Sequence, residues 1–385
     1  MSPAAPGRDV VVVGGGPAGA AFAATLRALA PELDLLVLDR ATFPRDKVCG
    51  DALTYRSLPL LREIFPALDL ELPSPAFTRR QTLVYPNGAV VRRAGQELDV
   101  VPRAVLDAAL WRALGAAGVE ALDGAEVHEL VRDGSRVAGV RVRRGGRSET
   151  VRASLVVGAD GSGSVVRRRT GPVSGDRTIC AVRQYVADLP AGLDGLHFLF
   201  DLELNGYFWV FPFVRDGSRW ANVGYGNSTS PRTVLPRFEE LLATPRVRDW
   251  LGGGRRVGRP CGFPLNLAAA GFPRRFDPAR ELSGEGYLLL GDAAALIHPL
   301  SGEGIAFALK SGEVAARVLA DARIPPERRG EAYRRELLRW ALPLYGDVGS
   351  FLAIRVPVLL PGLLSRAYVR GGSWLQRLVP AGSRT

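Results

Sequence analysis

Apolar runs alternate with glycine-rich loops near the start of the chain. Residues 9–13, DVVVV, are a short and mostly β-branched run, which predicts a buried parallel strand. The loop GGGPAG follows at 14–19, and AAFAATLRALA at 20–30 predicts a helix that packs small residues against a sheet. LDLLVLDR at 33–40 predicts the next strand. Together these segments predict a βαβ unit.

The middle of the chain has a strand-like pattern of polar and apolar positions. Residues 79–94 alternate around a PNG turn, 101–119 predict a helix, and 127–161 predict a β-meander that ends in the buried strand SLVVGAD. Residues 176–280 are rich in aromatic residues and proline, which predicts short antiparallel strands. A helical tail is expected from residue 331.

A dinucleotide-binding fingerprint lies between the first predicted strand and helix. Gly14 permits a tight turn, Gly16 lets the backbone approach a pyrophosphate, and Gly19 allows close helix–strand packing. The helix N-terminus attracts the phosphate charge. Asp39 ends the second strand about 20 residues later, where a carboxylate binds a ribose hydroxyl. In this context the glycines predict a bound dinucleotide rather than a structural turn.

Composition adds size and charge to this picture. The chain has 385 residues, 47% hydrophobic and 23% charged, which is long enough for two globular domains or one elaborated domain. Its net charge of +11 suits an anionic substrate, a membrane surface or nucleic acid. Only Lys47 and Lys310 are lysines, however, and scattered arginine also follows from genome composition. Without a recognisable nucleic-acid-binding motif, no nucleic-acid partner is expected.

Features of location point to a cytoplasmic protein. Three cysteines give no disulfide framework, and the N-terminus MSPAAPGRDV lacks the apolar segment of a signal peptide. No apolar run reaches the roughly 18 residues that cross a bilayer. Near the C-terminus, FLAIRVPVLLPGLL with Arg355, Arg366 and Arg370 interleaves apolar and basic residues. That pattern predicts either peripheral membrane contact or a core-packing helix pair.

Two later motifs also combine a strand with a glycine loop. GADGSGSVVRR at 158–168 follows a buried strand, and its Asp160 lies where the chain could turn beneath a cofactor. In GDAAALIHPLSGEGIAFAL at 291–309, Asp292 can accept a hydrogen bond from a ribityl hydroxyl. Gly302 and Gly304 there open a helix whose N-terminus can face a phosphate or a flavin carbonyl.

These three motifs resemble the flavoproteins of the para-hydroxybenzoate hydroxylase fold over about half the chain. The resemblance implies FAD as the tightly held dinucleotide. It also implies that Arg103 reaches the flavin side, that Val127 lies beside the adenine, and that Asp160 touches FAD or faces a nicotinamide. The cofactor-binding residues expected in all are Gly14, Gly16, Ala18, Gly19, Asp39, Arg40, Cys49, Gly50, Arg103, Val127, Asp160, Gly291, Asp292, Gly302, Gly304 and Ile305.

Two further segments resemble geranylgeranyl reductases. PRDKVCGD at 44–51 has their lysine, spacer and Cys-Gly at the same distance from the fingerprint. GYFWVFP at 206–212 resembles their Y-x-W-x-F-P stretch. Tyr207, Trp209 and Phe211 alternate on one strand face, so they can form a flat apolar wall for a prenyl chain. Core packing alone would also bury such aromatic residues.

Flavin-dependent halogenases are the competing resemblance. They carry a lysine in a similar segment, followed by Gly-Glu-Ser, and a W-x-W-x-I-P stretch. Here Lys47 is followed by Val-Cys-Gly-Asp, and the first aromatic residue is Tyr207, so both segments disfavour a halogenase. The alternatives for Lys47 are pairing with a carboxylate, pairing with a substrate phosphate, or exposure to solvent.

The thiol of Cys49 has three interpretations. It packs against the flavin as a small buried group, it donates or relays a proton to an alkene carbon, or it is a redox thiol. The last is disfavoured because no other cysteine is close in sequence. Cys180 and Cys261 are expected in the core, and His298 is expected to be structural. No metal-ligand spacing is present, so no metal site is expected.

The sequence therefore predicts an α/β flavoprotein, α+β overall, with a Rossmann-like FAD-binding domain, an antiparallel β-sheet substrate domain and a helical C-terminal part. The FAD-binding domain is expected to be discontinuous. The expected bounds are 1–75, 96–175 and 281–320 for the FAD-binding domain, 76–95 and 176–280 for the substrate domain, and 321–385 for the helical part.

The expected reaction is reduction of C=C bonds in a prenyl chain on a diphosphate, lipid or quinone. Cys49, Tyr207 and Trp209 are the expected catalytic residues, and Tyr207, Trp209 and Phe211 the substrate-binding ones. Electrons are expected from NADPH or another reductant, such as an electron-donor protein. The alternatives are an FAD-dependent monooxygenase of an aromatic or prenylated metabolite, and a non-catalytic FAD-binding protein.

Overall fold

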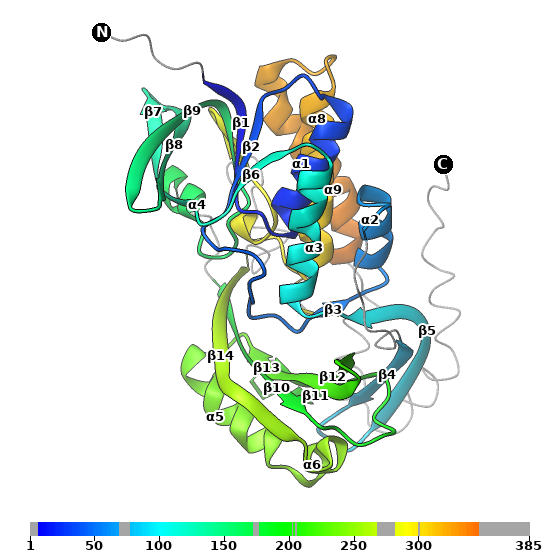
Figure 1. The fold of residues 1–385 in the computed structure, drawn as a ribbon. Coiled ribbons are helices and arrows are strands. Elements are labelled where there is room, and N and C mark those ends of the chain that lie inside the picture. Colours follow the sequence, from blue (N-terminus) through cyan, green and yellow to red (C-terminus); the bar gives the residue numbers. More distant parts are fainter. Residues whose placement is uncertain are drawn as a thin grey trace.

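Two eight-stranded sheets organise the described part of the chain, one above the other in Figure 1. The first carries the glycine-rich motifs, and the second carries the aromatic stretch around Trp209. The computed structural model describes residues 7–68, 78–171, 177–201, 203–204, 206–267, 282–298 and 301–345.

The first sheet has the strand order β15-β16-β9-β1-β2-β6, and the β7–β8 hairpin continues from β9. Its centre is parallel, because β1 pairs in parallel with both β2 and β9. The run Val10–Val13 is buried there, as expected of a strand covered on both faces. The strands are β1 (Arg8–Val13), β2 (Leu35–Leu38), β6 (Glu120–Leu122), β7 (Glu126–Asp133), β8 (Arg136–Arg144), β9 (Arg147–Gly158), β15 (Ser283–Gly284) and β16 (Tyr287–Leu289).

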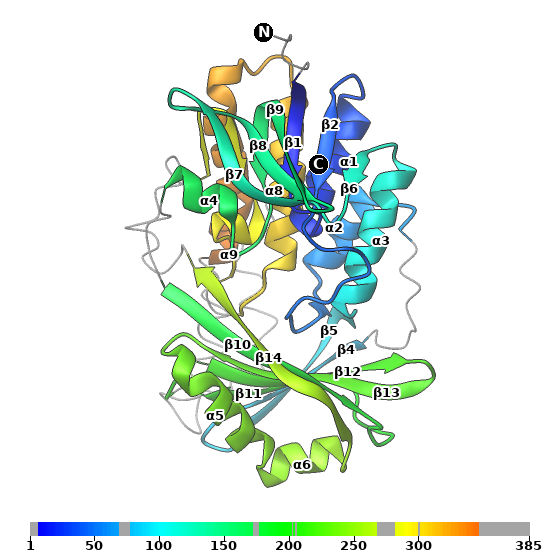
Figure 2. The ribbon, with the colours of Figure 1, turned by 60° about the vertical axis from the view of Figure 1, so that its left-hand side comes forward.

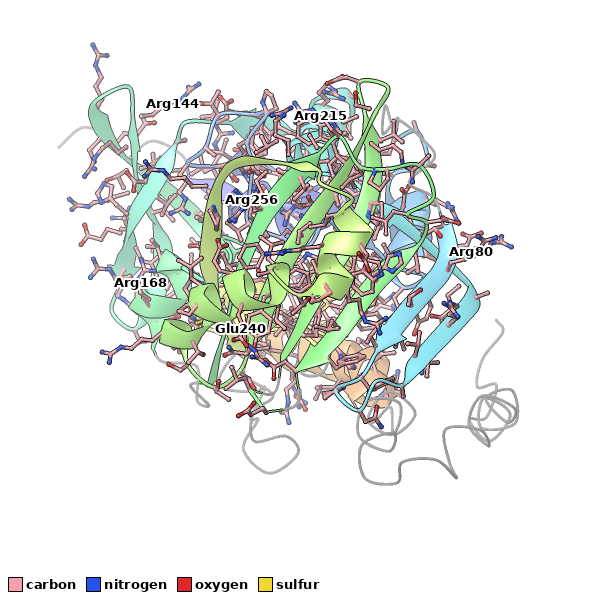
Figure 3. All side chains as sticks on the ribbon, turned by 90° about the horizontal axis from the view of Figure 1, so that it is seen from below. Arg80, Arg144, Arg168, Arg215, Glu240 and Arg256 are labelled. Atoms are coloured by element: carbon pink, nitrogen blue, oxygen red, sulfur yellow. The ribbon has the colours of Figure 1, made fainter. Side chains whose placement is uncertain are left out.

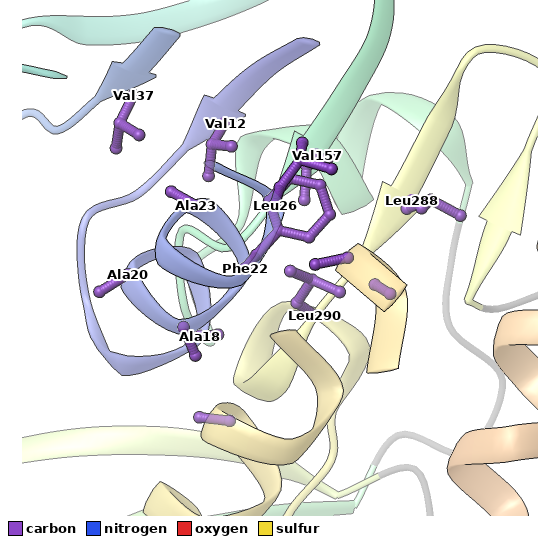
Figure 4. Packing of buried hydrophobic residues seen from close by; sticks show 14 of the residues in the cluster. Val12, Ala18, Ala20, Phe22, Ala23, Leu26, Val37, Val157, Leu288 and Leu290 are labelled. Carbon is purple, nitrogen blue, oxygen red and sulfur yellow. The ribbon is translucent and has the colours of Figure 1, made fainter. Parts of the chain in front are cut away.

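Helices cover one side of this sheet, and the β7–β9 meander lies on the other side (Figures 1 and 2). Helix α1 packs closely on α8, because a Cβ at Gly312 would lie only 2.4 Å from the carbonyl oxygen of Ala18. Phe22 and Leu26 fill the space between α1 and the sheet (Figure 4). The helices on the first side are α1 (Pro17–Leu29), α2 (Ser57–Ile64), α3 (Arg103–Ala116), α8 (Ile305–Ala320) and α9 (Arg329–Tyr345), whereas α4 (Val165–Thr170) lies beside the meander. The 3-10 turns are η2 (Gly291–Ala294) and η3 (Pro326–Arg328).

The second sheet has the order β14-β10-β13-β12-β11-β4-β5-β3. Helices α5 (Pro231–Leu242) and α6 (Pro245–Leu251) lie across its outer face, where Phe238 packs on Phe208 with ring centroids 5.8 Å apart (Figure 3). The arginines labelled in that view lie at separate places around the molecule rather than in one patch. The strands are β3 (Ala52–Leu53), β4 (Thr78–Val84), β5 (Val90–Val100), β10 (Arg177–Ala187), β11 (Leu196–Asp201), β12 (Gly206–Arg215), β13 (Ser218–Asn227) and β14 (Arg255–Leu267).

This architecture confirms the predicted fold class, a Rossmann-like layer with a second, largely antiparallel sheet. The second sheet differs from the expected pattern at one place, since β11 pairs with β4 in parallel. The predicted domain bounds stay a prediction. In the structure, β5 runs on to residue 100 and β3 joins its edge, so residues 96–100 and 52–53 lie in the second sheet.

The C-terminal part of the chain is helical as far as it is described. Helix α9 packs against α8 and ends at Tyr345. The predicted membrane-contacting segment around Arg355, Arg366 and Arg370 lies outside the described residues. Among the helices that the structure describes, none is long and apolar enough to cross a membrane.

Candidate active site

The glycine fingerprint forms the turn between β1 and α1. Gly14 has a φ of +107°, a conformation that side chains disfavour, and a Cβ there would lie 2.3 Å from the carbonyl oxygen of Ala159. A Cβ at Gly19 would lie 1.9 Å from the Gly14 carbonyl oxygen. Gly16 is the N-cap of α1, and no side chain caps that helix. The backbone N–H groups of the first turn are therefore available to an anion.

Asp39 is held at the end of β2. Its carboxylate accepts hydrogen bonds from the backbone N–H of Gly15 and of Ala41, each at 2.8 Å. The Asp39 backbone carbonyl accepts a further hydrogen bond from the Ala125 N–H at 2.8 Å. This bond brings the start of β7, with the buried Val127, alongside Asp39. Arg40 is exposed. The carboxylate is thus fixed beside the glycine turn, as a ribose-binding group requires.

Two arginines approach the glycine turn from its open side. A Cβ at Gly16 would lie 3.5 Å from a guanidinium nitrogen of Arg45 and 3.9 Å from one of Arg103. Both guanidinium groups bind the carboxylate of Asp107 at 2.7 Å. Burial lowers the pKa of Arg103, but the Asp107 carboxylate more than offsets this and raises it overall. Two permanent positive charges therefore lie where a diphosphate would meet the α1 N-terminus.

The second and third cofactor motifs are joined by Arg167. Its guanidinium donates to the carbonyl oxygens of Asp292 and Ala293, at 3.1 and 3.2 Å, and to the carbonyl of Ser162. Asp160 precedes α4 and accepts from the Val165 N–H at 2.6 Å, while its other carboxylate oxygen is buried without a hydrogen-bond partner. Burial raises the pKa of Asp160. The free oxygen is an acceptor that a bound hydroxyl or amide could satisfy.

The Asp292 carboxylate faces Lys47, with Gly304 beside the carboxylate and Gly161 beside the ammonium. The Lys47 ammonium lies 3.4 Å from the Asp292 carboxylate, so of the alternatives left open for this lysine the structure has the carboxylate pair. A Cβ at Gly304 would lie 3.2 Å from the other Asp292 oxygen, and one at Gly161 would lie 3.6 Å from the ammonium. Lys47 thus sits between the two motifs.

The loop before α8 reaches the second sheet. Gly291 and Gly302 have φ values of +52° and +68°, and Ile305 is buried as the first residue of the helix. The Tyr207 hydroxyl donates to the carbonyl of Ser301 at 2.6 Å. The aromatic strand β12 is therefore tied directly to the glycine loop.

His298 has the structural role expected from the sequence. Its Nδ1 accepts from the Ser301 N–H at 3.1 Å, and its Nε2 lies 3.0 Å from the Leu344 carbonyl oxygen. The expectation for Cys180 also holds, since that residue is buried. Cys261 is exposed on β14, so its predicted core position is wrong, because β14 is an edge strand of the sheet.

The segment PRDKVCGD runs between the two sheets and bonds to both of them. Its charged side chains bind α3, the 292 loop and β10, and its backbone binds β13. The pairs are Arg45 with Asp107, Lys47 with Asp292, Asp46 with Arg183, and the Cys49 carbonyl with Asn222. Cys49 and Gly50 are thereby fixed between the dinucleotide fingerprint and the aromatic strand.

Asp51 ends this segment as a fully buried carboxylate. One oxygen accepts from the Tyr185 hydroxyl at 2.7 Å and from the Asn222 amide at 2.8 Å, and the other has no hydrogen-bond partner. Burial raises its pKa to about 6, against the lowering effects of these two donors and of the Arg183 and Arg103 charges. Asp51 has a φ of 62°, the left-handed region that non-glycine residues seldom adopt.

The aromatic side chains of β12 form one continuous surface. Ring centroids are 5.8 Å apart for Tyr207 and Trp209 and 6.1 Å apart for Trp209 and Phe211. Phe198 of β11 extends the surface, 5.1 Å from Phe211. The Trp209 indole lies over Gly224, where a Cβ would come within 2.1 Å of the ring. We call Tyr207, Trp209, Phe211 and Phe198 the aromatic wall.

The Cys49 turn lies against this wall. A Cβ at Gly50 would lie 3.3 Å from the Phe211 ring and 3.7 Å from the Trp209 ring. Burial raises the pKa of the Cys49 thiol, although the nearby Arg103 charge opposes this. The thiol therefore holds its proton at neutral pH.

The residues present suit FAD. The uncapped α1 N-terminus and the two arginines suit a diphosphate, and the fixed Asp39 carboxylate suits a ribose. A Cβ at Gly14 or Gly19 would close the turn, so the glycines are required there. Comparison with known proteins agrees, since the family model for an FAD binding domain matches residues 8–233. A menaquinone reductase from Mycolicibacterium smegmatis is 30% identical over 392 residues, covering 91% of this chain and 89% of that protein.

The chain belongs to the geranylgeranyl reductase family of FAD-dependent oxidoreductases. A second relative of this oxidoreductase is the digeranylgeranylglycerophospholipid reductase of Methanoculleus marisnigri, 29% identical over 80% of this chain and 76% of that protein. A solved structure with the same fold is that of a geranylgeranyl bacteriochlorophyll reductase-like protein from Thermoplasma acidophilum. Its TM-score is 0.74 at 24% identity, and the match covers 90% of this chain and 88% of that one.

Several residues of the oxidoreductase's site were missed from the sequence. Arg45 lies in PRDKVCGD and Asp107 in the helix predicted over 101–119, and only the fold brings these two charged residues together. Asp51 stands beside Cys49, but nothing in the sequence shows that it is buried. Tyr185 and Asn222 are paired residues of β10 and β13, and their approach to Asp51 depends on strand register.

Proposed function

We propose that this flavoprotein reduces isolated C=C bonds in a prenyl chain carried on a diphosphate, a lipid or a quinone. The observation that carries the proposal is the close approach of the Cys49–Gly50 turn to the aromatic wall, where a Cβ added at Gly50 would lie 3.3 Å from the Phe211 ring. It sets a protonated thiol beside an apolar surface and next to the FAD site. The names of the two relatives, a menaquinone reductase and a digeranylgeranylglycerophospholipid reductase, support the same reaction class.

The proposed mechanism divides the work between the two sides of the site. An isolated alkene is unactivated, so it must be held closely and shielded from oxygen. Tyr207, Trp209 and Phe211 present the flat apolar surface that would hold it. Bound FAD, once reduced, supplies the hydride for one alkene carbon. Cys49 holds the proton for the other carbon.

The test is an anaerobic turnover of the purified protein. The flavin is reduced, geranylgeranyl diphosphate or a prenyl quinone is added, and the absorbance of oxidised flavin is followed. We expect reoxidation without oxygen and a product heavier by a pair of hydrogens for each bond reduced. If the flavin stays reduced until air is admitted and the substrate then gains oxygen, the protein is a monooxygenase and the proposal fails.

The role of Cys49 is tested by Cys49→Ser, with Cys180→Ser as the matched control. Both cysteines have a pKa raised by burial, but Cys180 lies on β10 and packs in the core of the second sheet. Loss of a general acid slows a reaction by about 100-fold or more. We expect that loss for Cys49→Ser with normal flavin content, and wild-type turnover for Cys180→Ser. Equal turnover of the two variants would remove Cys49 from the mechanism.

The electron source and the location extend the proposal. We propose that NADPH or another reductant, including an electron-donor protein, reduces the flavin in the cytoplasm. Stopped-flow mixing with NADPH tests NADPH as the reductant. If the flavin stays oxidised after mixing, NADPH is not the electron donor. We also propose peripheral membrane contact through residues 351–364, which lie outside the described residues. Liposome co-sedimentation that survives truncation of 351–385 would contradict that contact.

A further inference from the structure

The buried carboxyl group of Asp51 has no function in the mechanism above. It is joined to Cys49 by a single amide, because the side chain of Asn222 donates both to the Cys49 carbonyl and to the Asp51 carboxylate, each at 2.8 Å. The backbone N–H of Asp51 also hydrogen bonds to the Cys49 sulfur. The carboxyl and the thiol are therefore two neighbouring proton-bearing groups in one buried network.

Asp51 combines three features that are unfavourable for a structural residue. Its side chain is fully buried, one carboxylate oxygen lacks a partner, and its φ is 62°. Asparagine tolerates the left-handed conformation equally well. It could accept from Tyr185 and Asn222 through one oxygen, as Asp51 does, and would place an amide where the unpartnered oxygen lies. Only the aspartate can gain and lose a proton.

We propose that Asp51 restores the proton of Cys49 after each reduction, and this rests on the proposed function. In the reaction the Cys49 S–H bond breaks and its proton goes to one alkene carbon, while the other carbon receives the hydride. The Asp51 O–H bond then breaks and the Cys49 S–H bond reforms. Asp51 regains a proton from water, so one proton and one hydride are consumed for each bond reduced. Asp51 therefore acts through Cys49 and not on the alkene itself.

The charges around the pair set the direction of this transfer. Tyr185 and Arg183 face Asp51 from β10, Asn222 from β13 and Arg103 from α3. Lys47 and Arg103 act on the thiol from its own segment and from α3. The pKa of the Asp51 carboxyl is about 6, whereas the pKa of the Cys49 thiol is raised above its ordinary 9. A proton therefore moves downhill from the carboxyl to a newly formed thiolate.

The activity test compares Asp51→Asn with Asp99→Asn. Asp99 is the matched control, a largely buried carboxylate on β5, opposite Leu53, whose pKa is also raised by burial. In Asp51→Asn we expect a normal first turnover of reduced enzyme and a slowing of repeated turnover by about 100-fold, the lower range for acid–base groups. Asp99→Asn should keep the wild-type rates of the first turnover and of repeated turnover. Repeated turnover by Asp51→Asn at the wild-type rate would overturn the proposal.

The pH profiles of two variants distinguish a proton-transfer role of Asp51 from a structural role. Wild-type repeated turnover should fall as pH rises through an inflexion near 6, and Asp51→Asn should lack that inflexion. Tyr185→Phe removes a donor that lowers the pKa of Asp51, so its inflexion should move to higher pH. The proposal is contradicted if the inflexion stays in place in Tyr185→Phe and is retained in Asp51→Asn. If Asp51→Asn does not fold, the position of the inflexion in Tyr185→Phe decides by itself.

A readout without substrate distinguishes this proposal from the function on which it rests. With Cys180 and Cys261 replaced by serine, the pH profile of iodoacetamide alkylation reports the pKa of Cys49. The Asp51 carboxylate raises that pKa, so Asp51→Asn should move the midpoint to lower pH. Unchanged midpoints would refute the coupling. If the midpoint moves but no prenyl substrate reoxidises the flavin, the proposed function fails and with it the relay, while the coupled pair stands.

Discussion

The ionised carboxylate of Asp51 should destabilise the folded protein, and Asp51→Asn should remove that cost. The pKa of Asp51 is raised by burial from 3.8 to about 6. Each unit of pKa difference is worth about 1.4 kcal/mol, so holding the buried group ionised costs about 3 kcal/mol above pH 6. The pKa is higher in the folded state, so the folded state binds the proton more readily. Stability is therefore greatest below about pH 4 for this group and falls as pH rises through 6.

The assay is chemical unfolding of wild-type and Asp51→Asn protein, each loaded with FAD, between pH 4 and 8. The asparagine variant should gain little at pH 4 and about 3 kcal/mol in free energy of unfolding at pH 8. The hydrogen bonds from Tyr185 and Asn222 are available to the amide oxygen, so both of these donors keep an acceptor in the variant. Parallel stability curves for the two proteins across this range would refute the reasoning. A more stable but slower enzyme is the usual relation between stability and function at a site.

Three other substitutions test separate contacts of the site. Gly19→Ala should lose bound FAD and about 1–3 kcal/mol of stability, because its Cβ would lie 1.9 Å from a backbone oxygen. In the control Gly163→Ala the new Cβ meets open space, so this variant should keep its flavin, as measured by flavin absorbance. Trp209→Phe removes the 2.9 Å hydrogen bond to the buried Asn222, so unfolding should need about 1–3 kcal/mol less, and an unchanged denaturation midpoint would contradict this. Tyr207→Phe removes the 2.6 Å hydrogen bond to the glycine loop, so FAD should be released about fivefold faster, which corresponds to ~1 kcal/mol. Flavin fluorescence measures the release rate, and an unaltered rate would mean that this bond does not hold the loop.

The cofactor side of the site could be predicted because its signals are local. Gly14 and Gly19 follow a short apolar run and precede a helix, and the geometry that they require is decided by atoms of the same turn and of the adjoining strand end. Asp39 likewise ends the next strand, and its carboxylate binds Gly15. The alternation of Tyr207, Trp209 and Phe211 also determined that they share a face, whatever the sheet around them.

The rest of the site depends on contacts between distant segments. Asp51 is 134 residues from Tyr185 and 171 from Asn222, and these two meet it because β10 and β13 pair with Tyr185 opposite Asn222. A shift of one residue in that register would point one of the two side chains to the other face. The parallel pair of β4 and β11 was missed for the same reason, since neither strand's own pattern records which neighbour it joins.

The path of PRDKVCGD between the two sheets has a consequence for how the molecule opens. Its ion pairs reach Asp107 and Asp292 on the cofactor side, while Arg183 and Asn222 hold it from the other sheet. Local unfolding of either sheet must break contacts of this segment, so the two sheets share one cooperative unit of protection against hydrogen exchange. Binding a cofactor at the glycine turn then slows amide exchange in β10 and β13, which belong to the other sheet. Through this segment, a cofactor bound to the first sheet makes the second sheet more rigid.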